Sequence, residues 1–234
     1  MGSVGSVAHI VSNASPEAEK TLKQIIRKTQ NLKNEQYRII GEDGEVLVAG
    51  KGDAHKVSVT VGQKREYMEG NTSIHNHPAG GTFSDDDLRD FGFGARMIVV
   101  AAPNGEQYRL INDNYGTPKQ TEGWLALQTA LQRDVTSKMS DSPLYYLQTA
   151  RKNLENSREY KEMQRLSEKW VQRRKEGASQ EELQKYYDQY NKHAEVYKEK
   201  VKREQRRVEV RPAHEYLKKN AKKYGFTYSY KNPI

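Results

Sequence analysis

Apolar residues in the first half of the chain follow alternating helix-type and strand-type patterns. After Ser15-Pro16, apolar side chains recur at positions 18, 22, 25 and 26, which predicts a helix with one apolar stripe. Two apolar runs flank Asp43-Gly44, a dipeptide typical of hairpin turns. A further helix is expected from Ser84 to about Gly94. Strands are predicted at 36–40, 46–48, 57–61, 71–75, 97–101 and 108–111.

The second half carries mostly helix-forming residues. Residues 112–123 form a polar hinge, and the pattern beyond them predicts a long antiparallel helical hairpin that turns near Gly177. Arg211-Pro212 is expected to end the second long helix. A short helix at 214–223 and a closing strand or ordered tail at 224–230 follow.

These patterns predict an α+β protein of two domains. Residues 1–118 form the first, a sheet with flanking helices, and residues 119–234 form the second, a basic α-helical domain with a hairpin or coiled-coil-like arrangement. The apolar stripe of the helical domain is thin and aromatic, so its helices are expected to pack against the first domain or a partner.

Composition excludes several kinds of site. The chain of 234 residues has no cysteine, which rules out disulfides, thiolate zinc sites and cysteine nucleophiles. It has no run of about 18 apolar residues and no basic leader before an apolar core, so we expect a cytoplasmic protein with no membrane partner.

Charge is distributed unevenly along the chain. Residues 1–118 carry a net charge of −2, and residues 119–234 carry +10. A basic excess in one half favours an anionic partner, either nucleic acid or an acidic protein surface, but a solvated helical face explains it equally well. Tyrosines interleaved with lysines suit single-stranded nucleic acid, although such tyrosines more often pack helices. Protein interaction, including self-association, is favoured because 16 acidic residues are interspersed there.

His75-Asn76-His77-Pro78 is the strongest chemical signal in the sequence. Two histidines at i and i+2 of a strand point to the same face, and a turn after Pro78 can return Asp87 to that face. Two imidazoles and a carboxylate form a three-ligand site with an open position, as in catalytic zinc centres. The competing interpretation is structural, because Ser84-x-x-Asp87 is also an ordinary helix capping box. His193 and His214 lie among Lys and Glu on expected exposed helix faces and are not predicted ligands.

Hydrolysis at such a metal also needs a group that takes and returns a proton. Five glutamates precede the histidines: Glu35, Glu42, Glu45, Glu66 and Glu69. Glu35 is the best placed, because it lies where the chain passes from the first helix into the first strand. Glu42 and Glu45 flank the hairpin turn, and Glu66 and Glu69 lie in a polar segment.

The run at 35–41 (EQYRIIG), H-N-H-P at 75–78, Ser84 and Asp87 together resemble the JAB/MPN family of zinc proteases, whose signature is called JAMM. The resemblance covers roughly residues 15–111. It implies a cytidine-deaminase-like sheet and a zinc ion held by His75, His77 and Asp87. It also implies that Glu35 is the general acid/base and that Ser84 helps to hold the tetrahedral intermediate.

One departure from the family pattern affects the substrate class. Five residues separate Pro78 from Ser84, one fewer than is usual in the family, while Ser84-x-x-Asp87 is kept. This shorter form resembles JAB-type domains of phage and mobile-element proteins, and its H-N-H-P also resembles that of the RadC family.

Two functions remain open from the sequence. The first is a zinc metallopeptidase that cleaves a peptide or isopeptide bond in a protein substrate, which could be ubiquitin-like or a phage or host protein. The alternative is a non-enzymatic structural or DNA-binding protein of a phage or mobile element, with a JAB-like platform and a basic helical arm. An intact set of ligands with Glu35 favours the enzyme, because a purely structural site needs no open coordination position.

Overall fold

The computed structural model describes residues 10–53, 59–78, 80–139 and 143–231. Within these ranges no helix combines the length and apolar character needed to cross a bilayer. The chain divides into two compact units: residues 1–139 with 210–234, called the sheet unit, and residues 140–209, called the helical unit.

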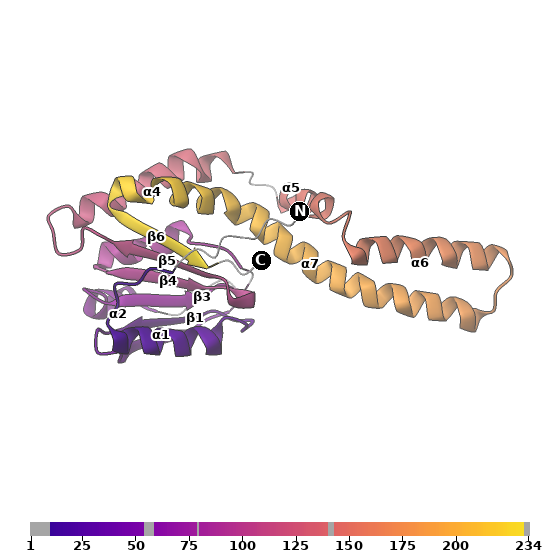
Figure 1. Ribbon diagram of the computed structural model, residues 1–234, viewed down its shortest axis with the longest axis horizontal. Helices are drawn as coiled ribbons and strands as arrows, with labels where there is room; N and C mark the ends of the chain where they lie inside the picture. The colour runs from indigo at the N-terminus through magenta and orange to yellow at the C-terminus, as the bar shows by residue number, and fades with distance from the viewer. Residues whose placement is uncertain (1–9, 54–58, 79, 140–142, 232–234) are drawn as a thin grey trace. The chain divides into compact units, whose positions relative to one another are not determined.

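The sheet unit is built on one mixed sheet of six strands (Figure 1). The strand order is β2-β1-β3-β4-β5-β6. Only β3 and β4 are parallel, and every other neighbouring pair is antiparallel. The strands are β1 (Gln36–Ile40), β2 (Val46–Lys51), β3 (Thr72–Asn76), β4 (Met97–Ala101), β5 (Gln107–Asn112) and β6 (Phe226–Lys231). The α+β class predicted from the sequence is confirmed.

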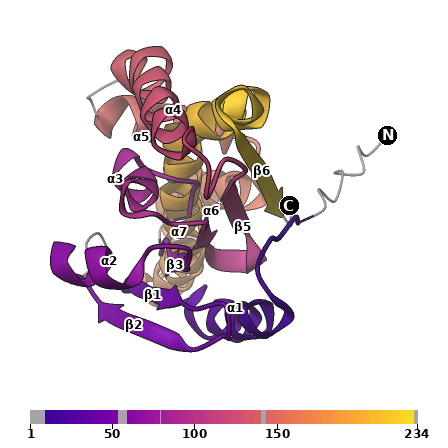
Figure 2. The ribbon, with the colours of Figure 1, turned by 90° about the vertical axis from the view of Figure 1, so that its left-hand side faces the viewer.

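Helix α1 (Pro16–Thr29) covers one face of this sheet (Figure 2). Its N-cap Ser15 accepts a hydrogen bond from the Ala18 N–H, and Pro16 occupies the first turn. The predicted stripe packs on Ile74, Met97 and Val99 of the central strands. A partly buried ion pair adds to this layer, because the two terminal guanidinium nitrogens of Arg109 donate to the Glu19 carboxylate at 2.7 and 2.9 Å.

The opposite face is covered by short elements and two longer helices. They are α2 (Val61–Tyr67), α3 (Asp85–Leu88), η1 (Arg89–Phe93), α4 (Gln120–Asp134), the end of α7 (Gln180–Asn220) and η4 (Ala221–Tyr224). The 3₁₀ turns η2 (Pro103–Gly105) and η3 (Thr136–Lys138) complete the unit. Leu127 and Leu131 of α4 and Leu217 of α7 are buried in one core with Ile98 and Leu110 of the sheet.

The compact units divide at 139/140 and 209/210 rather than at the expected boundary of 118/119. Helix α4 follows that boundary but buries Leu127 and Leu131 in the core of the sheet unit. Strand β6 pairs with β5 along its whole length, with Tyr228 opposite Leu110. The predicted closing strand is therefore real, and it returns the C-terminal segment to the first domain.

Two local predictions are also corrected. The expected strand at 57–61 falls partly outside the described residues, and Val61 instead begins α2, whose N-cap Thr60 forms a capping box with Gln63. Helix α7 continues through Pro212 rather than ending there. An internal proline costs about 3 kcal/mol. Beyond it Leu217 is fully buried, and burying a leucine side chain contributes about 1.5–3 kcal/mol in the opposite direction.

The helical unit contains α5 (Pro143–Asn153), α6 (Arg158–Lys175) and the first part of α7. Residues 176–179 join α6 to α7, with Gly177 at φ +80°, where the turn was expected. The two helices run antiparallel. Glu159 pairs with Lys200 at 2.6 Å at one end, and Glu182 pairs with Arg173 at 2.7 Å at the other.

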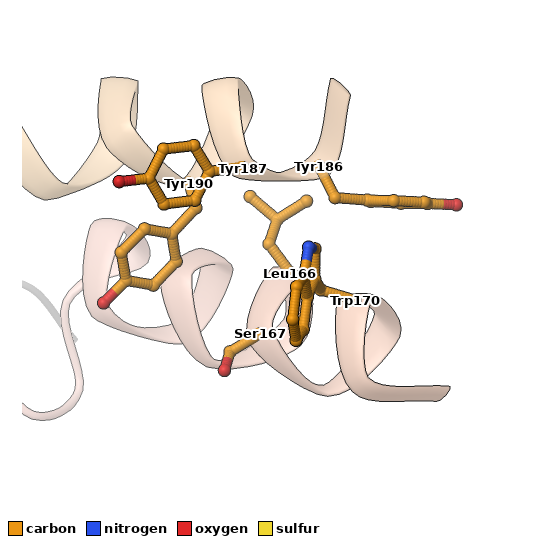
Figure 3. A pocket seen from close by; sticks show the side chains of 6 residues that line it. All are labelled: Leu166, Ser167, Trp170, Tyr186, Tyr187 and Tyr190. Atoms are coloured by element: carbon orange, nitrogen blue, oxygen red, sulfur yellow. The ribbon is translucent and has the colours of Figure 1, made fainter. Parts of the chain in front are cut away.

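Aromatic side chains line a groove of about 260 Å³ between α6 and α7 (Figure 3). Leu166, Ser167 and Trp170 come from α6, and Tyr186, Tyr187 and Tyr190 come from α7. The Arg174 guanidinium lies 5.2 Å from the centre of the Trp170 ring.

Candidate metal centre

His75, His77 and Asp87 converge on the sheet face opposite α1. The His75 Nε2 atom lies 2.9 Å from His77 Nε2 and 3.0 Å from Asp87 Oδ1. His77 Nε2 lies 3.6 Å from Asp87 Oδ2. All candidate ligand atoms lie within 4.8 Å of one another, and both histidines are buried. The three residues singled out in the sequence thus form a group that can hold a metal ion.

Strand alternation places the histidines. In β3, Ile74 points into the core under α1, whereas His75 points to the other face. The His77 N–H donates to the Ala101 carbonyl at 2.9 Å, which extends the parallel pairing with β4 beyond the end of β3. His77 therefore keeps the strand direction and shares the face of His75.

A short loop returns the chain to the histidines. Gly80 and Gly81 adopt φ values of +83° and +114°, a region that favours glycine. Phe83 is buried in the core and fixes the far end of the loop. Ser84 then caps α3, so that Asp87 lies one turn into the helix.

Asp87 serves the helix cap and the candidate metal group at the same time. The Ser84 N–H donates to Asp87 Oδ2 at 2.6 Å, and the Asp87 N–H donates to Ser84 Oγ at 3.3 Å. The other carboxylate oxygen, Oδ1, faces His75. The two interpretations left open by the sequence are therefore compatible, because the capping box orients the carboxylate toward the histidines.

The electrostatics of the group favour opposite charges. Burial disfavours protonation of His75, but the carboxylates of Asp87, Asp90 and Glu35 outweigh it and raise the pKa of His75. Burial alone would raise the pKa of the Asp87 carboxyl. His75, His77 and the Ser84 N–H outweigh it and hold that pKa well below its usual value. A cation at this position would satisfy the same charge balance as a proton on His75.

The donor atoms are close enough together to bind one small ion. Bonds of about 2.0–2.1 Å to zinc place neighbouring tetrahedral donors about 3.3 Å apart. His75 Nε2 lies 2.9 Å from His77 Nε2 and 3.0 Å from Asp87 Oδ1, whereas the 3.6 Å separation from His77 Nε2 is to the other carboxylate oxygen, Oδ2. Among the described residues, His75 Nδ1 has no hydrogen-bond partner. The ring is oriented instead by stacking on Tyr37, with centroids 6.1 Å apart and planes 22° apart.

Glu35 lies at the same end of the sheet. Strand β1 pairs with β3 antiparallel, with Tyr37 opposite His75, and continuing this register places Glu35 opposite His77. Alternation puts Glu35 on the face of Tyr37. Its half-buried carboxylate is close enough to His75 to contribute to the raised pKa of that residue.

The other upstream glutamates lie elsewhere. Glu42 pairs with Arg96 beyond the far end of β1, and Glu69 accepts a hydrogen bond from the Tyr115 hydroxyl at 3.0 Å. Glu66 interacts with Tyr67 at the end of α2. Glu45 is exposed in the hairpin. Of the five glutamates, Glu35 is among the main charges that raise the pKa of His75.

A buried polar network next to His75 was missed in the sequence. The Tyr37 hydroxyl donates to Asp90 Oδ2 at 2.8 Å, and the Lys64 ammonium lies 2.6 Å from Asp90 Oδ1. Burial and the Asp90 charge raise the pKa of Tyr37, so its hydroxyl remains a donor. Sequence spacing could have indicated two members of this network. Asp90 lies three residues after Asp87 in a helical segment, and Tyr37 lies two residues after Glu35 in a strand, so each shares a face with a predicted site residue. Spacing does not indicate Lys64, because its approach depends on tertiary packing.

Comparisons with protein-family models, with curated proteins and with solved structures gave no match. The resemblance to JAB/MPN proteases therefore rests on the motif residues.

Proposed function

We propose that this chain is a zinc-dependent metallopeptidase of the JAB/MPN type that hydrolyses a peptide or isopeptide bond. One observation carries the proposal: the buried His75 and His77 and the half-buried Asp87 bring their ligand atoms within 4.8 Å of one another, and the charge of Glu35 acts on His75. A structural metal site would need no acid/base group beside it.

Zinc, when bound, would supply a Lewis acid that polarises the scissile carbonyl and lowers the pKa of water. His75, His77 and Asp87 would hold it, and the capping hydrogen bond would fix the orientation of Asp87. Glu35 would accept a proton from the attacking water and later deliver it to the leaving amine. Its half-buried position, outside the ligand group, suits this exchange.

Ser84 is the proposed donor to the oxyanion. Its Oγ accepts the Asp87 N–H, so the hydroxyl proton is left for a second partner. The residue is exposed at the start of α3, where an extended substrate can reach it. A hydrogen bond to charge that develops only in the transition state accelerates the reaction.

The sheet supports a deaminase-like JAB/MPN fold. Its single parallel pair, β3–β4, is covered by α1 on one face and carries the candidate ligands on the other. The phage or mobile-element setting is proposed from the short loop at 79–83 alone.

The helical unit is proposed to bind a protein. Its aromatic groove offers apolar contacts, as protein interfaces do. Its 17 basic residues are interspersed with 13 acidic ones, and several of these form ion pairs within the unit. A surface of mixed charge suits a protein partner better than a polyanion.

Two measurements test the proposed function. Elemental analysis of the purified chain should give one zinc per chain. The loaded protein should then be incubated with a panel of ubiquitin-like fusions and with host lysate, alongside the Glu35→Gln variant. Cleavage by the wild type but not by the variant is expected. Bound zinc with no Glu35-dependent cleavage of any substrate would favour the structural alternative.

A further inference from the structure

We propose that Tyr228, near the C-terminus, is a positioning residue for the loop that leads to Ser84 and Asp87. The inference rests on the proposed function, because it assigns Tyr228 to the same metal site. Strand β6 lies outside residues 15–111, where the family resemblance is found.

The Tyr228 hydroxyl links the loop to helix α7. Its oxygen lies 3.0 Å from Thr82 Oγ1 and 2.8 Å from His214 Nδ1. The Tyr228 ring also meets Phe83 edge-on, with centroids 6.2 Å apart. Thr82 and Phe83 are both buried, and they immediately precede Ser84.

His214 is half-buried in this contact, whereas the sequence suggested an exposed helix face. Its ring packs against Tyr230 and Tyr108, with centroids 4.6 and 5.9 Å away. Burial lowers the pKa of His214, so the neutral ring can accept the Tyr228 hydroxyl proton. The Tyr228 oxygen is then free to accept from Thr82.

The two sides of this link differ in how firmly they are held. On one side, Tyr228 belongs to a strand paired with β5, and Leu217 anchors the end of α7 in the core. On the other side, residues 80–83 have no regular structure and include two glycines with positive φ. The hydroxyl therefore joins a rigid scaffold to the least regular part of the site.

The position of Asp87 depends on this loop. Contacts that orient a metal ligand typically change metal affinity by about 10- to 100-fold when removed. The hydroxyl of Tyr228 acts one step further out, through Thr82 and the cap at Ser84. We therefore expect the lower end of that range.

The test compares Tyr228→Phe with Tyr230→Phe, which removes a hydroxyl from the same strand but keeps the hydrogen bond between Tyr228 and Thr82. In the metal-free chain, hydrogen exchange at the amides of residues 82–87 should accelerate about tenfold in Tyr228→Phe, the size expected for loss of one hydrogen bond, and stay unchanged in Tyr230→Phe. Zinc affinity, measured by chelator competition, should fall about tenfold only in Tyr228→Phe. The absorption spectrum of bound Co²⁺ should change with it.

Thr82 provides an independent check if Tyr228→Phe folds poorly. Thr82→Val should show the same loss of zinc affinity and the same faster exchange as Tyr228→Phe, whereas Thr82→Ser should behave as the wild type. A variant that combines Thr82→Val with Tyr228→Phe should be no worse than either single change. Equal exchange and equal affinity in Tyr228→Phe and Tyr230→Phe, or in Thr82→Val and Thr82→Ser, would overturn the proposal. A wild type that binds no metal but shows the exchange difference would instead overturn the proposed peptidase and leave the positioning role intact.

Discussion

The side-chain oxygen of Asn76 accepts a hydrogen bond from the backbone N–H of Gln36 at 2.7 Å. Its amide group donates to the Asn34 carbonyl at 3.1 Å. The residue between the two histidines thus holds the backbone on both sides of Glu35. The Asn76 side chain itself is fully buried. One strand therefore positions both the metal ligands and the proposed acid/base group.

Replacing Asn76 by alanine should reduce hydrolysis while leaving metal binding nearly intact. The change removes the hydrogen bonds to the Gln36 N–H and the Asn34 carbonyl, which lie in partly exposed backbone, and each such bond contributes about 0.5–1.5 kcal/mol to stability. Urea denaturation should show a loss of that size. Asn112→Ala removes another buried asparagine, one that accepts from Asn114 instead, and is the control. If Asn76→Ala and Asn112→Ala reduced hydrolysis equally, the idea that Asn76 positions Glu35 would be contradicted.

Replacing Asp87 by asparagine should release the metal. The change removes the negative charge and one anionic ligand, so we expect at least a tenfold loss of zinc affinity by chelator competition. His75→Ala should likewise lose the metal while the helical content measured by circular dichroism is kept. Asp86→Asn is the control, because Asp86 is exposed and pairs with Arg89. Full zinc occupancy in His75→Ala would refute the ligand assignment.

Replacing Glu35 by glutamine should preserve metal content and abolish peptide hydrolysis. Glutamine keeps the shape of the side chain but cannot exchange the proton, a step typically worth about 10²- to 10⁴-fold in rate. Glu42→Gln should keep wild-type activity, because Glu42 pairs with Arg96 away from the histidines. Wild-type turnover by Glu35→Gln would assign the base to another residue.

Zinc affinity should begin to weaken, as the pH falls, above the ordinary pKa of histidine. The raised pKa of His75 means that protons compete with the metal before a typical histidine would titrate. In the metal-free chain, protonation of His75 stabilises the folded state instead. The folded state then holds the His75 proton more tightly than the unfolded state, so this stabilisation is present below the unfolded pKa and is lost as pH rises through the folded pKa.

The lowered pKa of Asp87 acts at the acidic end. Its stabilisation of the metal-free chain is present above the unfolded pKa and is lost as pH falls through the folded pKa. Urea unfolding with and without chelator, from pH 3 to pH 8, measures both effects. In His75→Ala, the free energy of unfolding near neutral pH should be the same with and without chelator. A metal-free stability that is independent of pH in both proteins would contradict the coupling.

Binding to DNA should be weak and should not depend on the aromatic groove. Phosphate contacts give a log–log salt slope of about −0.7 to −0.9 per contact, and the mixed charges of the helical unit permit few of them. Titration of the full chain with single- and double-stranded DNA at two salt concentrations measures this slope. Trp170→Ala, which removes a groove ring, should leave DNA affinity unchanged. Submicromolar, salt-sensitive binding that Trp170→Ala weakens would instead favour the nucleic-acid alternative.

Local spacing determined the ligand group. The separation of His75 and His77 fixes a shared strand face, and Ser84-x-x-Asp87 fixes a capped first turn, whatever surrounds them. The helix at 16–29 and the Asp43-Gly44 hairpin follow equally from patterns within one element. Each of these features depends on residues a few positions apart, so the sequence predicts them directly.

Only the tertiary structure decided which distant segments meet. The pairing of β1 with β3 brings Glu35 to the histidines, and the pairing of β6 with β5 brings Tyr228 to the loop at 80–83. Neither pairing follows from periodicity, because an apolar strand can pair with any open edge that matches its pleat. The continuation of α7 through Pro212 has the same cause: burial of Leu217 in a distant core opposes the local preference of proline.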